Sequence, residues 1–85
     1  MFYVYILHSV ALDKYYVGVS ANPQVRMKKH NRKHKGFTRR TNDWTMVYTE
    51  VYSYKADALL RERSIKNKKS RPFIEFLINS KNTKP

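Results

Sequence analysis

The chain contains no cysteine, which excludes disulfide scaffolds and zinc sites built on thiolates. Acidic residues are also few, since six Asp and Glu stand against 18 Lys and Arg, for a net charge of +12 over 85 residues. No stretch approaches the ~18 uninterrupted apolar residues that suggest a membrane span. The positive excess therefore favours a polyanionic partner, with nucleic acid ahead of an anionic membrane surface.

The N-terminal residues 1–9 lack both a basic stretch and a small-residue cleavage site, so they do not resemble a signal peptide. We therefore expect a cytoplasmic protein with no membrane partner. Apolar residues make up 41% of the chain, including seven tyrosines, four phenylalanines and one tryptophan, which is enough for a small core. We expect one domain over residues 1–79 and a polar C-terminal tail over residues 80–85.

Runs of β-branched and aromatic residues predict three strands, over residues 2–8, 15–19 and 44–52. The turn residues between the first two strands indicate a hairpin. The three strands, with the helices described next, give the order ββαβαα. This order predicts an α+β fold with a small, mostly antiparallel three-stranded sheet flanked by helices.

Helix start signals occur at three places. Asn22 followed by Pro23 predicts a first helix that ends near Asn31. Ser53 is a candidate cap for a second helix, which ends near residue 67. Ser70 and the proline that follows it predict a last helix. That helix is apolar nearly all round, which leaves open core packing or a homodimer contact; its apolar residues are Phe73, Ile74, Phe76, Leu77 and Ile78.

Tyrosines in the hairpin are the first candidates for chemistry. Because strand side chains alternate, Tyr5 lies on one face of the first strand, and Tyr16 shares a face with Gly18 in the second. A hairpin register can bring the two phenols together, with Gly18 leaving open backbone beside them. The alternative is structural, because strand tyrosines commonly pack the ring and keep the hydroxyl in water.

The first helix carries Arg26 and His30 at i and i+4, hence on one face. Arginine offers a planar fork for phosphate oxygens, and histidine can shuttle a proton near neutral pH. The alternative is a solvated basic face. Basic residues continue into the following loop, where they would bind the phosphate backbone or simply form a solubilising surface; the cluster comprises Lys28, Lys29, Arg32, Lys33, Lys35, Arg39 and Arg40.

The six acidic residues are scattered along the chain, which argues against a two-metal nuclease site. A site with one carboxylate and one Mg²⁺ remains open, because Mg²⁺ binds through few carboxylates together with water and phosphate oxygens. Glu62 lies in the middle of the second helix. The bland interpretation of Glu62 is a helical ion pair with Lys66 at i+4.

Several of these residues stand in the order and spacing of a known family. The sequence resembles the GIY-YIG endonuclease superfamily, in particular its small single-domain bacterial members related to the catalytic domain of the excision-repair nuclease. The resemblance covers roughly residues 2–70, although Tyr3 stands where the first motif has glycine and valine replaces both motif isoleucines. It rests on Tyr3-Val4-Tyr5, Tyr16-Val17-Gly18, Arg26, His30 and Glu62, with support from residues 37–40, 44–50 and 58–66.

The resemblance implies a metal-dependent endonuclease that hydrolyses DNA phosphodiester bonds. Because neither a zinc finger nor a helix-turn-helix pair stands out in the sequence, we expect selectivity for DNA structure and a role in repair or recombination. One Mg²⁺ or Mn²⁺ would bind at Glu62, and Gly18 would lie at the nucleic-acid surface. The general base stays open among the two tyrosines and the histidine. The alternative is a non-catalytic nucleic-acid-binding module of the same fold. The residues implied in catalysis are Tyr5, Tyr16, Arg26, His30 and Glu62.

Overall fold

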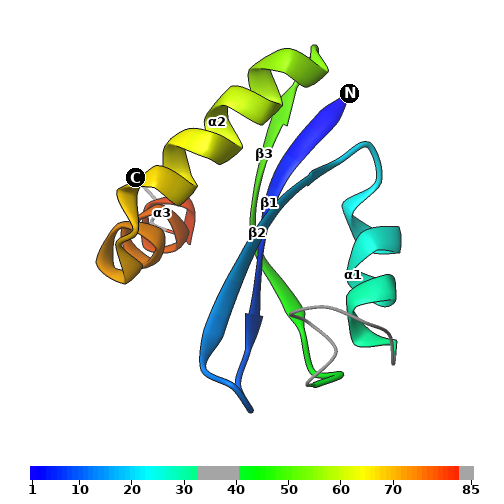
Figure 1. Ribbon diagram of the computed structural model, residues 1–85, viewed down its shortest axis with the longest axis vertical. Helices are drawn as coiled ribbons and strands as arrows, with labels where there is room; N and C mark the ends of the chain where they lie inside the picture. Colours follow the sequence, from blue (N-terminus) through cyan, green and yellow to red (C-terminus); the bar gives the residue numbers. More distant parts are fainter. Residues whose placement is uncertain (33–40, 83–85) are drawn as a thin grey trace.

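The computed structural model describes residues 1–32 and 41–82. Its elements follow the predicted order ββαβαα, so the α+β fold with a three-stranded antiparallel sheet is confirmed (Figure 1). They are β1 (Phe2–Ser9), β2 (Lys14–Ser20), α1 (Pro23–Asn31), β3 (Thr45–Tyr52), α2 (Lys55–Lys68) and α3 (Arg71–Asn82).

The strand order in the sheet is β2-β1-β3, which makes β1 the central strand and leaves β2 and β3 as edges. In the register of the hairpin, Tyr5 lies opposite Gly18, and on the other side it lies opposite Thr49 of β3. A bulge interrupts the pairing of β1 with β3 between Ile6 and Leu7. The central strand is buried on both faces, because both faces carry helices.

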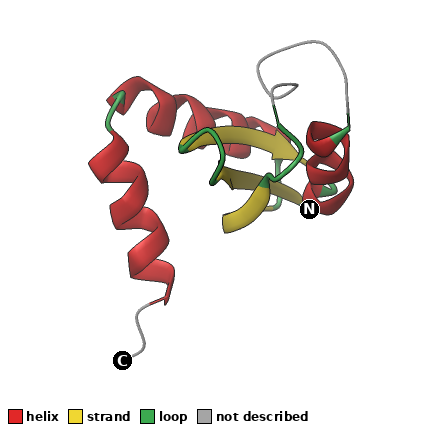
Figure 2. Ribbon diagram, turned by 90° about the horizontal axis from the view of Figure 1, so that it is seen from below, coloured by secondary structure: helices red, strands yellow, loops and turns green. Residues whose placement is uncertain are grey.

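Each face of the sheet has its own apolar cluster, as the alternation of side chains predicts. Figures 1 and 2 show α1 on one side of the sheet and α2 with α3 on the other. The cluster facing α1 contains Tyr5, Leu7 and Trp44. The larger cluster, facing α2 and α3, contains Val4, Ile6, Val17, Tyr48, Ala58, Ile65 and Leu77. The two tyrosines expected to act together, Tyr5 and Tyr16, therefore face α1.

Helix α1 begins as predicted: Pro23 occupies its first turn, and Asn22 Oδ1 accepts a hydrogen bond from the backbone N–H of Val25 at 3.3 Å. At its C-terminal end Asn31 bonds both backbone groups of Trp44, at 2.7 Å to the nitrogen and 3.0 Å to the oxygen. Trp44, which we expected in the third strand, precedes β3 and is 2% exposed. These two hydrogen bonds hold the end of α1 against the segment that precedes β3.

The predicted cap of α2 is wrong. Tyr54 occupies the N-cap position in an extended conformation, and no side chain caps the helix there. Ser53 lies one residue too early for its hydroxyl to reach the free N–H groups of the first turn. By contrast, Ser70 does start α3, because its hydroxyl accepts a hydrogen bond from the backbone N–H of Phe73 at 3.2 Å.

Helix α3 differs from the expectation in two ways. It continues to Asn82, so residues 80–82 are helical, and the predicted polar tail starts inside a helix. It is also amphipathic, because Leu77 is buried and three further apolar residues pack on the same core, leaving Phe76 exposed at 64%. Core packing of this helix is thus present, and the homodimer contact stays the open alternative. Within the two described ranges, no helix is both long and apolar enough to cross a membrane.

Candidate active site

Three rings meet on the α1 face of the hairpin. The Tyr5 hydroxyl lies 3.3 Å from Nε2 of His30, a hydrogen bond whose donor depends on the histidine tautomer. The rings of Tyr16 and His30 are 4.4 Å apart between centroids, and those of Tyr5 and Tyr16 are 6.3 Å apart. Tyr5 is 1% and His30 7% exposed, whereas Tyr16 is only half-buried. Of the three groups, Tyr16 is the one most accessible from solvent.

Gly18 does not leave open backbone beside these rings, contrary to our expectation. A Cβ placed on it would lie 2.6 Å from the Tyr5 hydroxyl oxygen, 2.7 Å from Tyr5 Cζ and 3.1 Å from a ring carbon of Tyr16. These separations are far shorter than a van der Waals contact. The space above Gly18 is therefore filled by Tyr5, because the absence of a side chain on Gly18 leaves room for the tyrosine ring.

Arg26 reaches the same place from the exposed side of α1. Burial raises the pKa of the Tyr5 phenol above its ordinary value of 10.0, while the Arg26 guanidinium acts in the opposite direction. Tyr16 and Glu62 also raise this pKa, which places both groups within electrostatic range of the Tyr5 hydroxyl. The phenol of Tyr5 is therefore protonated at neutral pH.

Glu62 comes from α2, on the opposite side of the sheet from α1 (Figure 1). Its side chain is 20% exposed and pairs with Lys66, whose Nζ lies 3.0 Å from Glu62 Oε2. The same ammonium lies 6.0 Å from the centroid of the Tyr16 ring. Residues from both sides of the sheet thus approach each other across the edge strand β2. The helical ion pair with Lys66 is present, and it lies within the candidate site.

The structure accordingly brings together the five predicted catalytic residues: Tyr5, Tyr16, Arg26, His30 and Glu62. Of the predicted basic cluster, Lys28, Lys29 and Arg32 lie exposed at the end of α1. Lys33, Lys35, Arg39 and Arg40 lie outside the described residues.

Sequence reasoning missed the supports of the site, Asn31 and Trp44. The only local signal for them is an asparagine directly after His30.

Among the described residues, no group of three His, Asp or Glu side chains could hold a metal ion. Glu62 would then be the single carboxylate ligand, with water and phosphate oxygens completing the shell, a set that Mg²⁺ accepts. Most other acidic residues have structural partners. Asp13 and Glu75 both bind Arg71, while Asp43 accepts bonds near the hairpin turn.

Glu50 is one of these structural carboxylates. It lies on β3 with its side chain 17% exposed, and Arg61 donates to it from Nε at 3.0 Å. Tyr48 and Tyr52 also donate their hydroxyls to it. Burial would raise the pKa of Glu50, but the hydrogen bonds from these three residues outweigh it and lower the pKa. Burial and the neighbouring carboxylate together raise the pKa of Tyr48 to about 12.

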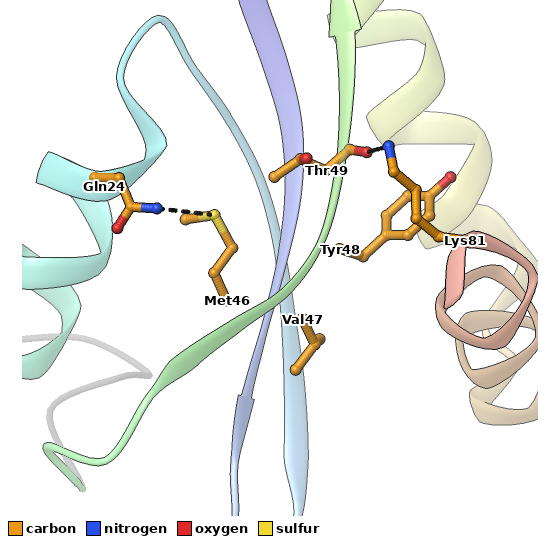
Figure 3. A pocket seen from close by; sticks show the side chains of 6 residues that line it. All are labelled: Gln24, Met46, Val47, Tyr48, Thr49 and Lys81. Atoms are coloured by element: carbon orange, nitrogen blue, oxygen red, sulfur yellow. Dashed lines mark hydrogen bonds between the residues drawn. The ribbon is translucent and has the colours of Figure 1, made fainter. Parts of the chain in front are cut away.

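A pocket lies along β3, the edge strand on the opposite side of β1 from β2. Figure 3 shows Gln24 and Met46 at one side of this strand and Lys81 at the other, with Lys81 Nζ donating to the Thr49 carbonyl oxygen at 2.7 Å. None of its described lining residues belongs to the predicted catalytic set. Lys81 occupies a backbone acceptor that an edge strand leaves unpaired, which protects that edge.

Comparison with protein families identifies the family of the chain. The model of the GIY-YIG catalytic domain matches residues 1–75, most of the 85-residue chain. The chain therefore belongs to the GIY-YIG family, and its fold is of nuclease type. Comparisons with curated proteins and with solved structures give no significant match.

Proposed function

We propose that this chain is a metal-dependent endonuclease that hydrolyses phosphodiester bonds in DNA, with selectivity for branched, nicked or single-stranded structure and a role in repair or recombination. One observation carries the proposal. A guanidinium, a buried phenol–imidazole pair and a carboxylate from three separate elements converge at one sheet edge. A stable fold has no need to gather these groups, whereas hydrolysis of a phosphodiester can use each of them.

Arg26 is the residue that neutralises the charge growing on the non-bridging phosphate oxygens, because its guanidinium is exposed yet acts on the Tyr5 hydroxyl. Tyr5, which stays protonated, donates a hydrogen bond that orients either the attacking water or the phosphate. The proton of that water goes either to Tyr16 in its phenolate form or to the unprotonated ring nitrogen of a neutral His30. Tyr16 has the better access to solvent, whereas His30 lies within hydrogen-bond distance of the Tyr5 hydroxyl.

Glu62 is the residue that would hold one Mg²⁺ or Mn²⁺. A cation bound there would polarise a phosphoryl oxygen and stabilise the leaving oxyanion. Exposed Lys28, Lys29 and Arg32 would bind neighbouring phosphates and give salt-dependent affinity that carries no sequence information.

Cleavage of plasmid, branched and single-stranded DNA in Mg²⁺ or Mn²⁺ tests the proposal, with matched RNA substrates alongside. We expect Glu62→Gln, Arg26→Ala and Tyr5→Phe each to lower the cleavage rate by about 10²-fold or more. Asp57→Asn and Tyr54→Phe remove a carboxylate and a hydroxyl from exposed positions, so they are matched controls and should cleave like the wild type.

Two outcomes would contradict this function. Wild-type rates in Glu62→Gln would show that any activity comes from elsewhere. Binding of DNA without cleavage, under every metal and substrate condition, would instead identify a nucleic-acid-binding module of the same fold. Tyr16→Phe and His30→Ala, compared over a range of pH, separate the two candidate bases, because only loss of the true base removes the rise in rate with pH.

A further inference from the structure

Lys66 is an exposed lysine that lies beside the candidate site. It lies one helical turn after Glu62 on α2, with its ammonium 3.0 Å from Glu62 Oε2 and 6.0 Å from the Tyr16 ring centroid. Its side chain is 51% exposed, whereas that of Glu62 is 20% exposed. The lysine is thus held beside the candidate site by its ion pair with Glu62, the carboxylate with the proposed metal-binding role. Its exposure to solvent leaves room for the side chain to move.

An ammonium and a divalent cation cannot both take the same carboxylate oxygen without strong repulsion. An exposed ion pair of this kind is weak, so a divalent cation can displace the lysine at small cost. The displaced ammonium stays on its stem beside Tyr16 and β2. Arg26 approaches from α1, on the other side of that edge. A phosphate between Lys66 and Arg26 would be bound by one cationic side chain from α2 and one from α1.

We propose that Lys66 is shared between two partners: it holds Glu62 in the free protein and binds a backbone phosphate of the nucleic acid once a divalent cation has taken Glu62. The inference rests on the proposed function, because it requires a metal ion at Glu62. It assigns α2 a direct contact with substrate, in addition to the basic surface of α1. It also makes metal binding and nucleic-acid binding cooperative through one side chain.

Two binding measurements test this without relying on cleavage. Mn²⁺ affinity of the protein alone, followed by electron paramagnetic resonance, should rise about two- to fivefold in Lys66→Met, because a competing ion pair is gone. DNA affinity, followed by fluorescence anisotropy of a labelled branched oligonucleotide, should fall in Lys66→Met when Ca²⁺ is present and change little in EDTA. In Ca²⁺ the salt slope should drop by about one.

Lys66→Arg keeps the charge and should retain most of the Ca²⁺-dependent DNA affinity. Lys55→Met removes the same charge from an exposed position at the start of α2, so its effect on DNA affinity should be the same with and without Ca²⁺. Unchanged Mn²⁺ affinity in Lys66→Met, no Mn²⁺ binding at all, or an equal loss of DNA affinity in Ca²⁺ and EDTA would each overturn the inference. Cleavage lost in Glu62→Gln would still stand in that event, so the two proposals fail separately.

Discussion

Tyr5 shows how one residue serves both the core and the candidate site. Its ring belongs to the apolar cluster on the α1 face, and the residue is 1% exposed. Its hydroxyl is hydrogen-bonded to His30 and lies within electrostatic range of Arg26 and Glu62. A ring held this firmly gives its hydroxyl a fixed position, which is what a group that orients a reacting atom needs. The same firmness makes the surroundings of the ring intolerant of added volume.

Gly18 is where that intolerance can be measured. We expect Gly18→Ala to lower the free energy of unfolding by about 1–3 kcal/mol, because the new methyl would overlap Tyr5, which cannot swing out of its buried place. Cleavage should fall as well, since the hydroxyl must move. Urea denaturation with linear extrapolation gives the change in stability.

A double variant makes the cause specific. Tyr5→Phe removes the hydroxyl oxygen, the atom nearest to the added methyl at 2.6 Å. Tyr5→Phe combined with Gly18→Ala should therefore lose less stability than the sum of the two single variants. Strict additivity would mean that the Tyr5 hydroxyl oxygen is not what the methyl meets.

At the scale of elements, a single carboxylate ties the hairpin turn to the segment before β3. Asp43 accepts hydrogen bonds from the Ser9 hydroxyl at 2.5 Å, the Thr41 hydroxyl at 2.6 Å and the Ala11 backbone N–H at 2.9 Å. The bonds from Ser9, Thr41 and Ala11, in that order of strength, lower the pKa of Asp43 from 3.8 to about 2. Each of these bonds favours the charged form.

This lowered pKa predicts an acid-sensitive connection. A folded-state pKa below the unfolded one adds stability that is fully present above about pH 4 and is lost as the pH falls towards about 2. We expect Asp43→Asn to melt at a lower temperature than the wild type at pH 7. The gap should narrow between pH 4 and pH 2, as measured by circular dichroism melts.

Asp57→Asn is the matched control, because it removes one carboxylate from the exposed first turn of α2. Its melting temperature should stay close to that of the wild type over the same range of pH. A gap between Asp43→Asn and the wild type that is unchanged at pH 2 would show that the carboxylate charge adds nothing.

Elements built on local signals were predictable from the sequence. The hairpin and its two faces follow from strand alternation, and the start of α1 follows from Asn22 and Pro23, since both depend on neighbours in the chain. The predicted cap at Ser53 was wrong because a side chain caps a helix only from the extended residue directly before it. In α2 that residue is Tyr54. Family resemblance, not geometry, singled out Glu62.

Contacts between elements could not be predicted. Asn31 binding Trp44 and Arg61 binding Glu50 depend on where each helix end lies over the sheet, which no local pattern encodes. For the same reason the Gly18 expectation failed. Its residue type indicated space, but the register with Tyr5 decided what fills that space.

At the scale of the whole molecule, the sheet divides the site. Tyr5, Tyr16 and His30 gather on the α1 face, while Glu62 and Lys66 belong to the helix on the other face. The two groups meet across β2, an edge strand that no other strand covers among the described residues. A site at an edge is open to a long polymer from one side. This placement suits a nucleic-acid strand better than a small ligand.

The remaining surface of α3 bears on the association state of the whole molecule. Most of its apolar side chains pack inward, and Phe76 alone among them is largely exposed. One phenylalanine contributes about 150–250 Å², well short of the roughly 1,200 Å² of a stable interface, and a net charge of +12 repels a second copy. We therefore expect light scattering to give the monomer mass for both wild type and Phe76→Ser up to high concentration. A dimer mass that appears with concentration in the wild type and disappears in Phe76→Ser would instead establish the homodimer contact through this helix.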